Sequence, residues 1–233
     1  MEHFYDRTKR LLNEDAIKLL SDKHVVILGI GGVGSWATEA LARTGIGHFT
    51  LVDFDRIEPS NINRQIHATN NTVGQYKTVA MKERITQINP TATVYCLTEQ
   101  IRPDLSSDFF ADIFGDADFT IDCMDDVRAK TAVIKWHLTK NKMIISSMGT
   151  GNKLGRMPFH IVDISKTKIC PLARAVRLQL RREGINTGVP VLYSEEQPYR
   201  EPIANQKPGT ICFVPAEAGL ELAKYVVLKL LEI

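Results

Sequence analysis

The feature that most constrains the fold is a glycine-rich turn at residues 29–34, directly after an apolar run. The run His24-Val25-Val26-Ile27-Leu28 is typical of a strand buried in a parallel sheet, and residues 35–44 have the composition of a helix. Glycines in such a turn let the backbone approach an anion closely, and the following helix offers it unpaired N–H groups. The segment therefore predicts a site for nucleotide phosphates.

Strand and helix continue to alternate beyond this turn. Strands are expected at 48–52, 93–97, 118–122 and 143–147, and helices at 77–88 and 127–140. Such alternation predicts an α/β fold with a doubly wound, mostly parallel, Rossmann-like sheet. We expect a single domain over 1–233, with an N-terminal helical arm at 1–24 and a nucleotide-binding core at 25–150.

After about residue 151 the regular alternation of strand and helix ends. Strands at 159–162 and 189–193, a helix at 172–182 and a final amphipathic helix at 218–233 predict a smaller C-terminal extension over 151–233. Its polar, proline-containing stretch at about 194–209 is expected to be a long surface loop. It could serve as a lid or as a second contact with a large substrate, and the sequence does not decide between these roles.

The cysteines and the overall charge exclude several classes of protein. None of the four cysteines forms a C-x-x-C pair, so no zinc clip is expected. Cys170 and Cys212 are the late candidates for cysteine chemistry, but packed, reduced thiols are the simpler interpretation. No apolar run approaches about 18 residues, and the net charge is only +2. We expect a cytoplasmic protein without a membrane span.

The residues after the second strand decide which nucleotide is bound. Asp53 lies about 20 residues after the turn, where a carboxylate can bind a ribose hydroxyl, and on this evidence alone an NAD-dependent dehydrogenase is favoured. Asn61, Arg64, Lys77 and Asp125 have no evident use in such a site. Cations that spread charge on the phosphates, with a carboxylate that holds Mg²⁺, are what chemistry at the α-phosphate of ATP requires.

Each of these residues also has a purely structural interpretation. Arg64 could be a surface salt-bridge partner, Lys77 a solvated helix residue, and Asp125 a cap for the helix that follows it. Their joint occurrence in this order favours an ATP site.

The segments 29–34, 53–55, 60–65, 74–77 and 122–125 together resemble the ubiquitin-activating-enzyme superfamily, most strongly over residues 5–150. This superfamily includes bacterial adenylyltransferases for molybdopterin and thiamine sulfur carriers. The resemblance implies that a substrate carboxylate attacks the α-phosphate of ATP to give an acyl-adenylate and pyrophosphate. It implies nucleotide contacts from Gly29, Gly31, Gly32, Gly34, Asp53, Asp55, Asn61, Arg64 and Lys77, with Asp125 on Mg²⁺. It also implies a homodimer in which Arg10, with Arg7 as the reserve, reaches into the partner's site.

Within this superfamily, residues 29–36, 39–47 and 63–68 look more like the tRNA threonylcarbamoyladenosine dehydratases. That likeness implies adenylation of the threonyl carboxylate of the modified adenosine, followed by ring closure by the side chain's own nitrogen with net loss of water. No enzyme cysteine is needed. His67 could be the base, but a hydrogen-bonded structural histidine is at least as plausible.

Other functions stay open. The main alternative is an adenylyltransferase that activates the C-terminus of a ubiquitin-like sulfur carrier, which the missing cysteine pairs disfavour. A nucleotide-binding scaffold without catalysis is another. Sulfur-transfer proteins are candidate partners.

A tRNA substrate should leave a basic surface. Residues 164–182 contain no acidic residue and carry Lys166, Lys168, Arg174, Arg177, Arg181 and Arg182. The three arginines at 174, 177 and 181 share one helix face. We expect this segment to contact tRNA, although a merely solvated basic helix would have the same sequence.

Overall fold

The computed structural model describes residues 3–199, 206 and 208–233. Their core is a seven-stranded sheet in the order β3-β2-β1-β4-β5-β7-β6. The strands are β1 (His24–Leu28), β2 (His48–Val52), β3 (Thr93–Leu97), β4 (Phe119–Asp122), β5 (Ile144–Ser147), β6 (Phe159–Asp163) and β7 (Pro190–Ser194). All neighbours are parallel except β6 and β7. The predicted mostly parallel α/β fold is confirmed.

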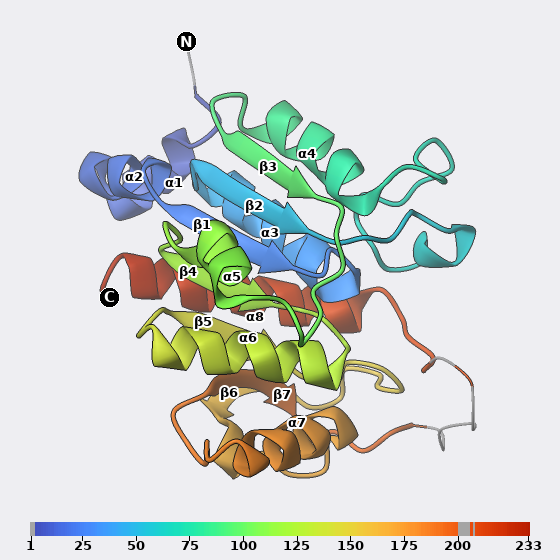
Figure 1. Cartoon of the computed structure of the whole chain (residues 1–233). Helices are drawn as coiled ribbons and strands as arrows, with labels where there is room; N and C mark the ends of the chain where they lie inside the picture. Colours follow the sequence, from blue (N-terminus) through green and yellow to red (C-terminus); the bar gives the residue numbers. More distant parts are fainter. Residues whose placement is uncertain (1–2, 200–205, 207) are drawn as a thin grey trace.

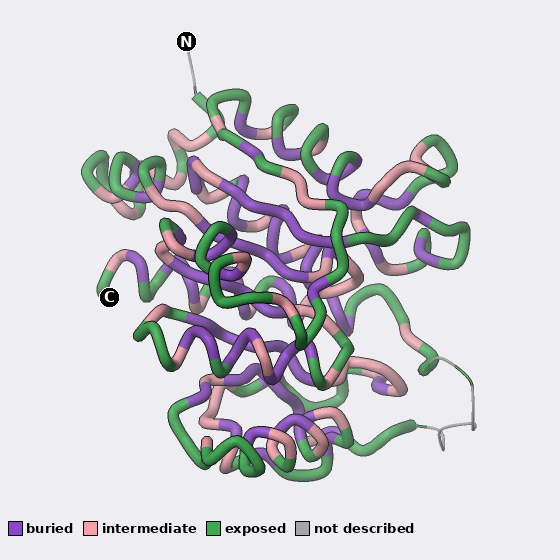
Figure 2. The backbone as a smooth tube through the Cα atoms, in the orientation of Figure 1, coloured by how far each residue is buried: buried purple, intermediate pink, exposed green. Residues whose placement is uncertain are grey.

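Helices cover both faces of the sheet (Figure 1). They are α1 (Asp6–Leu12), α2 (Glu14–Ser21), α3 (Gly32–Thr44), α4 (Lys77–Ile88), α5 (Ser107–Phe114), α6 (Val127–Thr139), α7 (Pro171–Arg182) and α8 (Phe213–Leu230), with short 3₁₀ turns η1 (Pro59–Asn61) and η2 (Ile164–Lys166). Side chains alternate along β1: Val25 and Ile27 pack with α3, α4 and α8, whereas Val26 and Leu28 pack with α5, α6 and α7. Burial on both faces explains why the strands are continuously apolar (Figure 2).

The predicted elements differ from the observed ones in three places. The helix after the glycine turn begins at Gly32, so two of its glycines lie inside the first turn. Helix α5 was missed, although the Ser106 side chain caps it and three of its apolar residues share a buried face. The last helix begins at Phe213, and its Pro215 is tolerated because the first turn of a helix needs no N–H donors.

The C-terminal segments join the same sheet and the same helical layer. Strand β7 extends the sheet from β5, pairing Ser146 with Val191. Helix α8 lies very close to α3, since a Cβ at Gly219 would stand 2.6 Å from the carbonyl oxygen of Val33. Helix α8 therefore packs directly behind the helix that follows the glycine turn. Of the predicted loop at 194–209, residues 200–205 and 207 lie outside the described residues.

Among the described residues, no helix is both long enough and apolar enough to cross a membrane.

Candidate nucleotide-binding site

The glycine turn lies at the carboxyl end of β1, beside the carboxyl end of β4. Gly29 has φ +81°, and a Cβ there would stand 3.0 Å from the backbone carbonyl of Cys123. A Cβ at Gly34 would collide with the Gly29 oxygen at 2.0 Å. Gly31 has looser surroundings, with only the Gln65 amide within 4.0 Å of its Cβ position, whereas a Cβ at Gly32 would stand 3.1 Å from Pro215. Gly29 and Gly34 therefore shape the turn, Gly32 permits close packing against Pro215, and Gly31 leaves backbone open to a phosphate.

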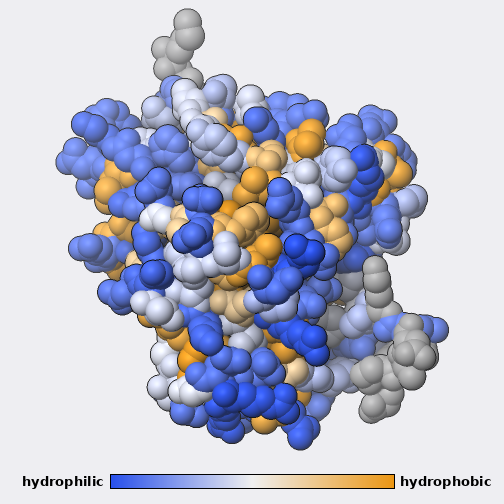
Figure 3. Space-filling view, in the orientation of Figure 1, coloured by the Kyte–Doolittle hydropathy of each residue, from blue (hydrophilic) through white to orange (hydrophobic). Residues whose placement is uncertain are grey.

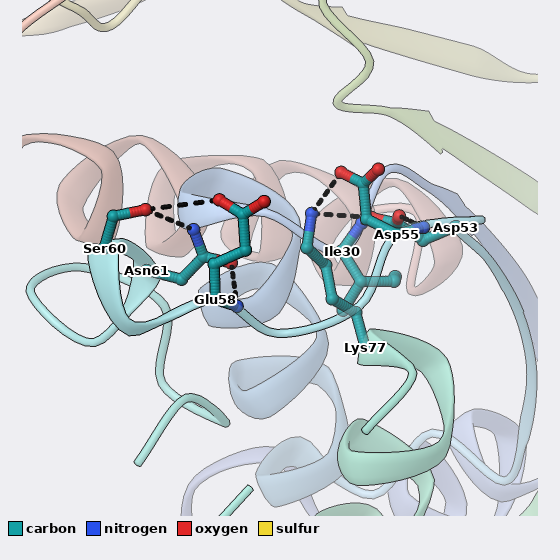
Figure 4. Close-up of polar contacts among 7 residues, drawn as sticks. All are labelled: Ile30, Asp53, Asp55, Glu58, Ser60, Asn61 and Lys77. Atoms are coloured by element: carbon teal, nitrogen blue, oxygen red, sulfur yellow. Dashed lines mark hydrogen bonds and ion pairs between the residues drawn. The ribbon is translucent and has the colours of Figure 1, made fainter. Parts of the chain in front are cut away.

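Asp53 fastens this turn to the end of β2 (Figure 4). Its Oδ2 accepts a hydrogen bond from the Ile30 N–H at 2.7 Å, and its Oδ1 accepts one from the Asp55 N–H at 2.9 Å. Burial raises the pKa of Asp53, and the nearby ammonium of Lys77 opposes that rise. Both carboxylate oxygens of Asp53 thus already accept hydrogen bonds from the backbone. A ribose hydroxyl would have to bind to the lone pairs that these bonds leave free.

Lys77 opens α4 and is buried, so it is not a solvated surface residue. Its Nζ lies 2.6 Å from Asp55 Oδ2 and 3.8 Å from Asp53 Oδ2. The Asp55 side chain is 49% exposed. The Arg56 guanidinium stacks on the Tyr76 ring, 3.9 Å from its centroid, and the two residues also form an isolated β-bridge. These contacts hold the segment after β2 against the start of α4. Lys77 and Asp55 therefore meet in a fixed place between the glycine turn and solvent.

Asn61 ends the short turn η1, and Arg64 lies three residues after it. Asn61 is buried and its Oδ1 accepts a hydrogen bond from the Glu58 N–H at 3.1 Å. The Arg64 guanidinium donates to the Ser60 carbonyl at 2.8 Å and to Asn63 Oδ1 at 2.7 Å. No ion pair joins Arg64 to a carboxylate in the described part of the chain. Its Cδ would lie 3.5 Å from a Cβ at Gly32, so the side chain of an uncompensated cation passes beside the glycine turn.

Asp125 lies in the loop after β4. This loop is joined to the turn because the Cys123 N–H donates to the Leu28 carbonyl at 2.7 Å. The cap of α6 is the neighbouring Asp126, which accepts from the Ala129 N–H at 2.7 Å. Asp125 itself is exposed and has no hydrogen bond or ion pair within the described ranges. The structural interpretation of Asp125 as a helix cap is therefore wrong.

Sequence reasoning did not predict the buried ion pair that supports the loop carrying Asp125. Asp122 and Lys130 are both fully buried, and Lys130 Nζ lies 3.0 Å from Asp122 Oδ2. The same carboxylate accepts from Ser146 Oγ at 2.6 Å and from the Met124 N–H at 3.1 Å. The available signal was an aspartate ending an apolar strand, with a lysine eight residues later on a helix.

His67 is buried below the turn, and its surroundings differ from the hydrogen-bonded histidine that was considered. Neither ring nitrogen has a hydrogen-bond partner among the described residues. Burial and, secondarily, the Lys77 charge lower the pKa of His67 to about 4, so the ring is neutral at physiological pH. With only 3% of the residue exposed, it is poorly placed to reach a substrate as a base.

Arg10 is not brought to the site within one chain. Helices α1 and α2 lie beside the amino ends of β1 and β2, where the Gly47 N–H bonds to the Leu20 carbonyl (Figure 1). The glycine turn lies at the carboxyl ends. Arg10 is exposed on α1, so any role in catalysis requires a second chain.

The basic segment is exposed with one exception. Lys166, Lys168, Arg174 and Arg181 face solvent, and strongly hydrophilic side chains gather over α7 (Figure 3). Arg177 is half-buried and donates to the carbonyl of Thr167 at 2.9 Å and to its hydroxyl. The Arg177 guanidinium therefore braces the residue that follows the η2 turn, and its contact with tRNA stays a prediction. Cys170 is buried and Cys212 is exposed.

These residues fit ATP with Mg²⁺. No group of three metal-ligating side chains occurs among the described residues. Mg²⁺ needs only one or two carboxylates when phosphates and waters complete its octahedron, and Asp125 and the half-exposed Asp55 can supply them. The open backbone at Gly31, with the Arg64 side chain beside the turn, suits the phosphates.

Comparisons with known proteins identify the family to which the chain belongs. The ThiF family matches residues 5–189. The chain is 39% identical over 247 residues to the tRNA threonylcarbamoyladenosine dehydratase of Bacillus subtilis, covering 100% of this chain and 96% of that protein. It is 37% identical to the Escherichia coli protein of the same name, covering 91% and 79%. The molybdopterin-synthase adenylyltransferase of E. coli matches only half of the chain, at 34% identity over 50% of it.

Solved structures give the same result. The crystal structure of E. coli tRNA N6-threonylcarbamoyladenosine dehydratase superposes with a TM-score of 0.89 at 33% identity, covering 98% of this chain and 94% of that one. A structure of that enzyme in complex with ATP superposes with a TM-score of 0.87, covering 98% and 93%. The chain therefore belongs to the ThiF family and, within it, to the tRNA threonylcarbamoyladenosine dehydratases.

Proposed function

We propose that this protein uses ATP to dehydrate threonylcarbamoyladenosine in tRNA to its cyclic form. The observation that carries the proposal is the Arg64 side chain beside the glycine turn, with its Cδ 3.5 Å from the Cβ position of Gly32 and no carboxylate partner in the described residues. A cation left uncompensated beside a phosphate-binding turn suits charge that develops only during reaction. Relatives along the whole chain carry this activity in their names.

The chemistry proceeds in two displacements. A threonyl carboxylate oxygen attacks the α-phosphorus of ATP, and the bond to the bridging oxygen of pyrophosphate breaks. The carbamoyl nitrogen then attacks the activated carbonyl carbon, loses its proton and expels AMP, which keeps the carboxylate oxygen. The oxygen that the substrate loses therefore ends in AMP. The net reaction removes one water from the nucleoside and splits ATP into AMP and pyrophosphate.

The side chains of the site have separate roles in these steps. Arg64 and Lys77 spread the charge on the α-phosphate and the leaving pyrophosphate. Lys77 is already held beside Asp55 at 2.6 Å, so an incoming phosphate competes with that carboxylate for the ammonium. Asp125 would hold Mg²⁺, which supplies Lewis-acid charge on the phosphates when bound.

The remaining parts of the proposal concern partners. We expect a homodimer, since Arg10 can reach a nucleotide site only in another chain. Lys166, Lys168, Arg174 and Arg181 form the exposed basic surface that suits the tRNA backbone. A tRNA substrate places the enzyme in the cytoplasm, where sulfur-transfer proteins are candidate partners.

The test is a product assay with MgATP and tRNA that contains threonylcarbamoyladenosine. The expected products are AMP, pyrophosphate and a nucleoside lighter by one water. Formation of ADP, or no nucleotide cleavage with this tRNA, would overturn the proposal. Unmodified tRNA is the matched control and should leave ATP intact.

A further inference from the structure

A cavity separate from the nucleotide site lies next to it, between the loop at 150–157 and the start of α8. Its volume is about 180 Å³, and it is lined by Asn152, Lys153, Leu154, Tyr199, Thr210 and Ile211. Pockets for drug-sized ligands hold roughly 300–1,000 Å³, so this one suits a single flat ring system. None of its lining residues takes part in the ATP site described above.

The cavity walls are held together although they come from loops. Asn152 joins two of them, because its carbonyl accepts from the Tyr199 N–H at 2.7 Å and its N–H donates to the Gly209 carbonyl at 2.7 Å. Its side-chain oxygen also accepts from the Gly209 N–H at 2.8 Å. These bonds span residues that are far apart in the sequence, so the walls keep their spacing.

A network of buried hydrogen bonds supports the floor of the cavity. Lys153 Nζ is buried and donates to the carbonyls of Ser194 and Glu196. The Glu196 carboxylate accepts from the N–H groups of Leu154 at 2.7 Å and Arg156 at 3.0 Å. These contacts satisfy the Lys153 ammonium and the Glu196 carboxylate, whereas the buried hydroxyl of Thr210 in the cavity wall has no hydrogen-bond partner among the described residues.

One wall offers a stacking surface. Tyr199 is 56% exposed, and the Arg156 guanidinium lies 5.3 Å from its ring centroid. Aromatic rings and guanidinium planes are the groups on which proteins stack unpaired bases of RNA.

The cavity is tied to the loop that carries Arg64. The Asn63 side chain, one residue before Arg64, donates to the Thr210 carbonyl at 3.1 Å. Pro215, a few residues beyond the cavity wall, lies 3.1 Å from the Cβ position of Gly32. A ligand in the cavity therefore lies beside the place where the α-phosphate of ATP would be held.

We propose that this cavity binds the purine base of the substrate nucleoside, stacked on Tyr199, so that its threonyl carboxylate extends toward Arg64. The proposal rests on the proposed function. A purine could also come from ATP itself, and the experiment separates the two sources.

The experiment uses the full-length protein and compares Tyr199→Ala with Tyr199→Phe. Binding of free threonylcarbamoyladenosine is measured by calorimetry with a non-hydrolysable ATP analogue present, and binding of the analogue is measured separately. Tyr199→Ala should weaken nucleoside binding about tenfold, which is the loss of one stack of 1.4 kcal/mol, and leave the analogue's affinity unchanged. Tyr199→Phe keeps the ring and should bind as the wild type does. Tyr95→Ala removes another exposed tyrosine, on edge strand β3, and should change neither affinity.

Two results would overturn the cavity assignment: unchanged nucleoside binding in Tyr199→Ala, or a loss confined to the ATP analogue. The second result would make the cavity the site of ATP's own adenine. Steady-state assays with modified tRNA add an independent readout, in which Tyr199→Ala should raise KM for tRNA and not for ATP. Failure of the proposed function looks different: the wild type would form no AMP with modified tRNA, while nucleoside binding would still report on the cavity.

Discussion

The Lys130 ammonium lies 3.0 Å from the Asp122 carboxylate, and solvent reaches neither side chain. This pair spans the loop that carries Asp125, since Asp122 ends β4 and Lys130 lies in the second turn of α6. Asp122 also accepts from the Met124 N–H inside the loop. The pair therefore fixes both ends of the loop that presents Asp125 to the nucleotide.

Replacing Lys130 by Met should unfold the protein more easily, because it leaves the Asp122 charge buried and uncompensated. The expected loss in the free energy of unfolding is about 3–5 kcal/mol, measured by urea titration. The double variant Asp122→Asn with Lys130→Met removes both charges and should recover most of that stability. A single variant within about 1 kcal/mol of the wild type would contradict the burial of this pair.

Asp125→Asn should lower kcat/KM for ATP roughly a hundredfold and raise the Mg²⁺ concentration needed for half-maximal rate. The melting temperature should stay the same, because this exposed side chain has no partner within the described part of the chain. The matched control is Asp126→Ala, which removes the α6 cap. It should cost about 1 kcal/mol of stability and leave the Mg²⁺ dependence intact. If Asp126→Ala changed the Mg²⁺ dependence and Asp125→Asn did not, Asp126 would be the metal ligand instead.

Stability should fall as the pH is lowered from 6.5 to 4. Burial lowers the pKa of His67 and of His137 from 6.5 to about 4, so the unfolded chain binds protons in this range and the folded protein does not. The two histidines should leave the free energy of unfolding at its full value above pH 6.5. Below that, the free energy of unfolding should fall as the pH approaches 4, by roughly 3 kcal/mol per histidine. Urea titrations at several pH values measure it.

His67→Leu separates the two histidines. The His67 ring has no hydrogen-bond partner among the described residues, so the variant should be within about 1.5 kcal/mol of the wild type at pH 7.5 and less sensitive to acid. His137→Leu breaks bonds to Val133 and Thr120 and should be destabilised at every pH. A His67→Leu variant as acid-sensitive as the wild type would refute this account.

Arg174 and Arg177 should behave differently when each is replaced by Met. Arg174 is exposed, so its loss should weaken tRNA binding, reduce the salt dependence of that binding and leave the melting temperature unchanged. Arg177 braces Thr167, so its loss should lower the melting temperature. Filter binding at two salt concentrations, with thermal unfolding, measures both effects. Equal effects from the two variants would contradict the geometry.

Much of the fold could be predicted because its strands are short apolar runs that end in turn residues. The runs at 24–28 and 48–52 match β1 and β2 residue for residue. Helix α5 was missed because it has only eight residues and follows a loop without periodicity. The start of α3 was placed late because glycines disfavour helices in general, whereas here they lie in the first turn.

The site could be predicted only as far as its motif residues. Arg64, Lys77 and Asp125 follow the glycine turn in a fixed order, and the structure brings their segments to one edge of the sheet. The Asp122–Lys130 pair depends on how α6 packs over β4 and β5, and the spacing of the two residues along the chain is only a weak signal for it. The engagement of Arg177 likewise depends on the η2 turn ten residues earlier. Such pairings arise from tertiary packing.

The central claim is that the substrate carboxylate attacks the α-phosphorus of ATP. The most direct measurement uses modified tRNA whose threonyl carboxylate is labelled with ¹⁸O, followed by mass spectrometry of the nucleotide products. The account predicts one ¹⁸O atom in AMP and none in pyrophosphate, because the activated oxygen leaves with AMP on ring closure. Unlabelled AMP, or ¹⁸O in inorganic phosphate together with ADP, would contradict it.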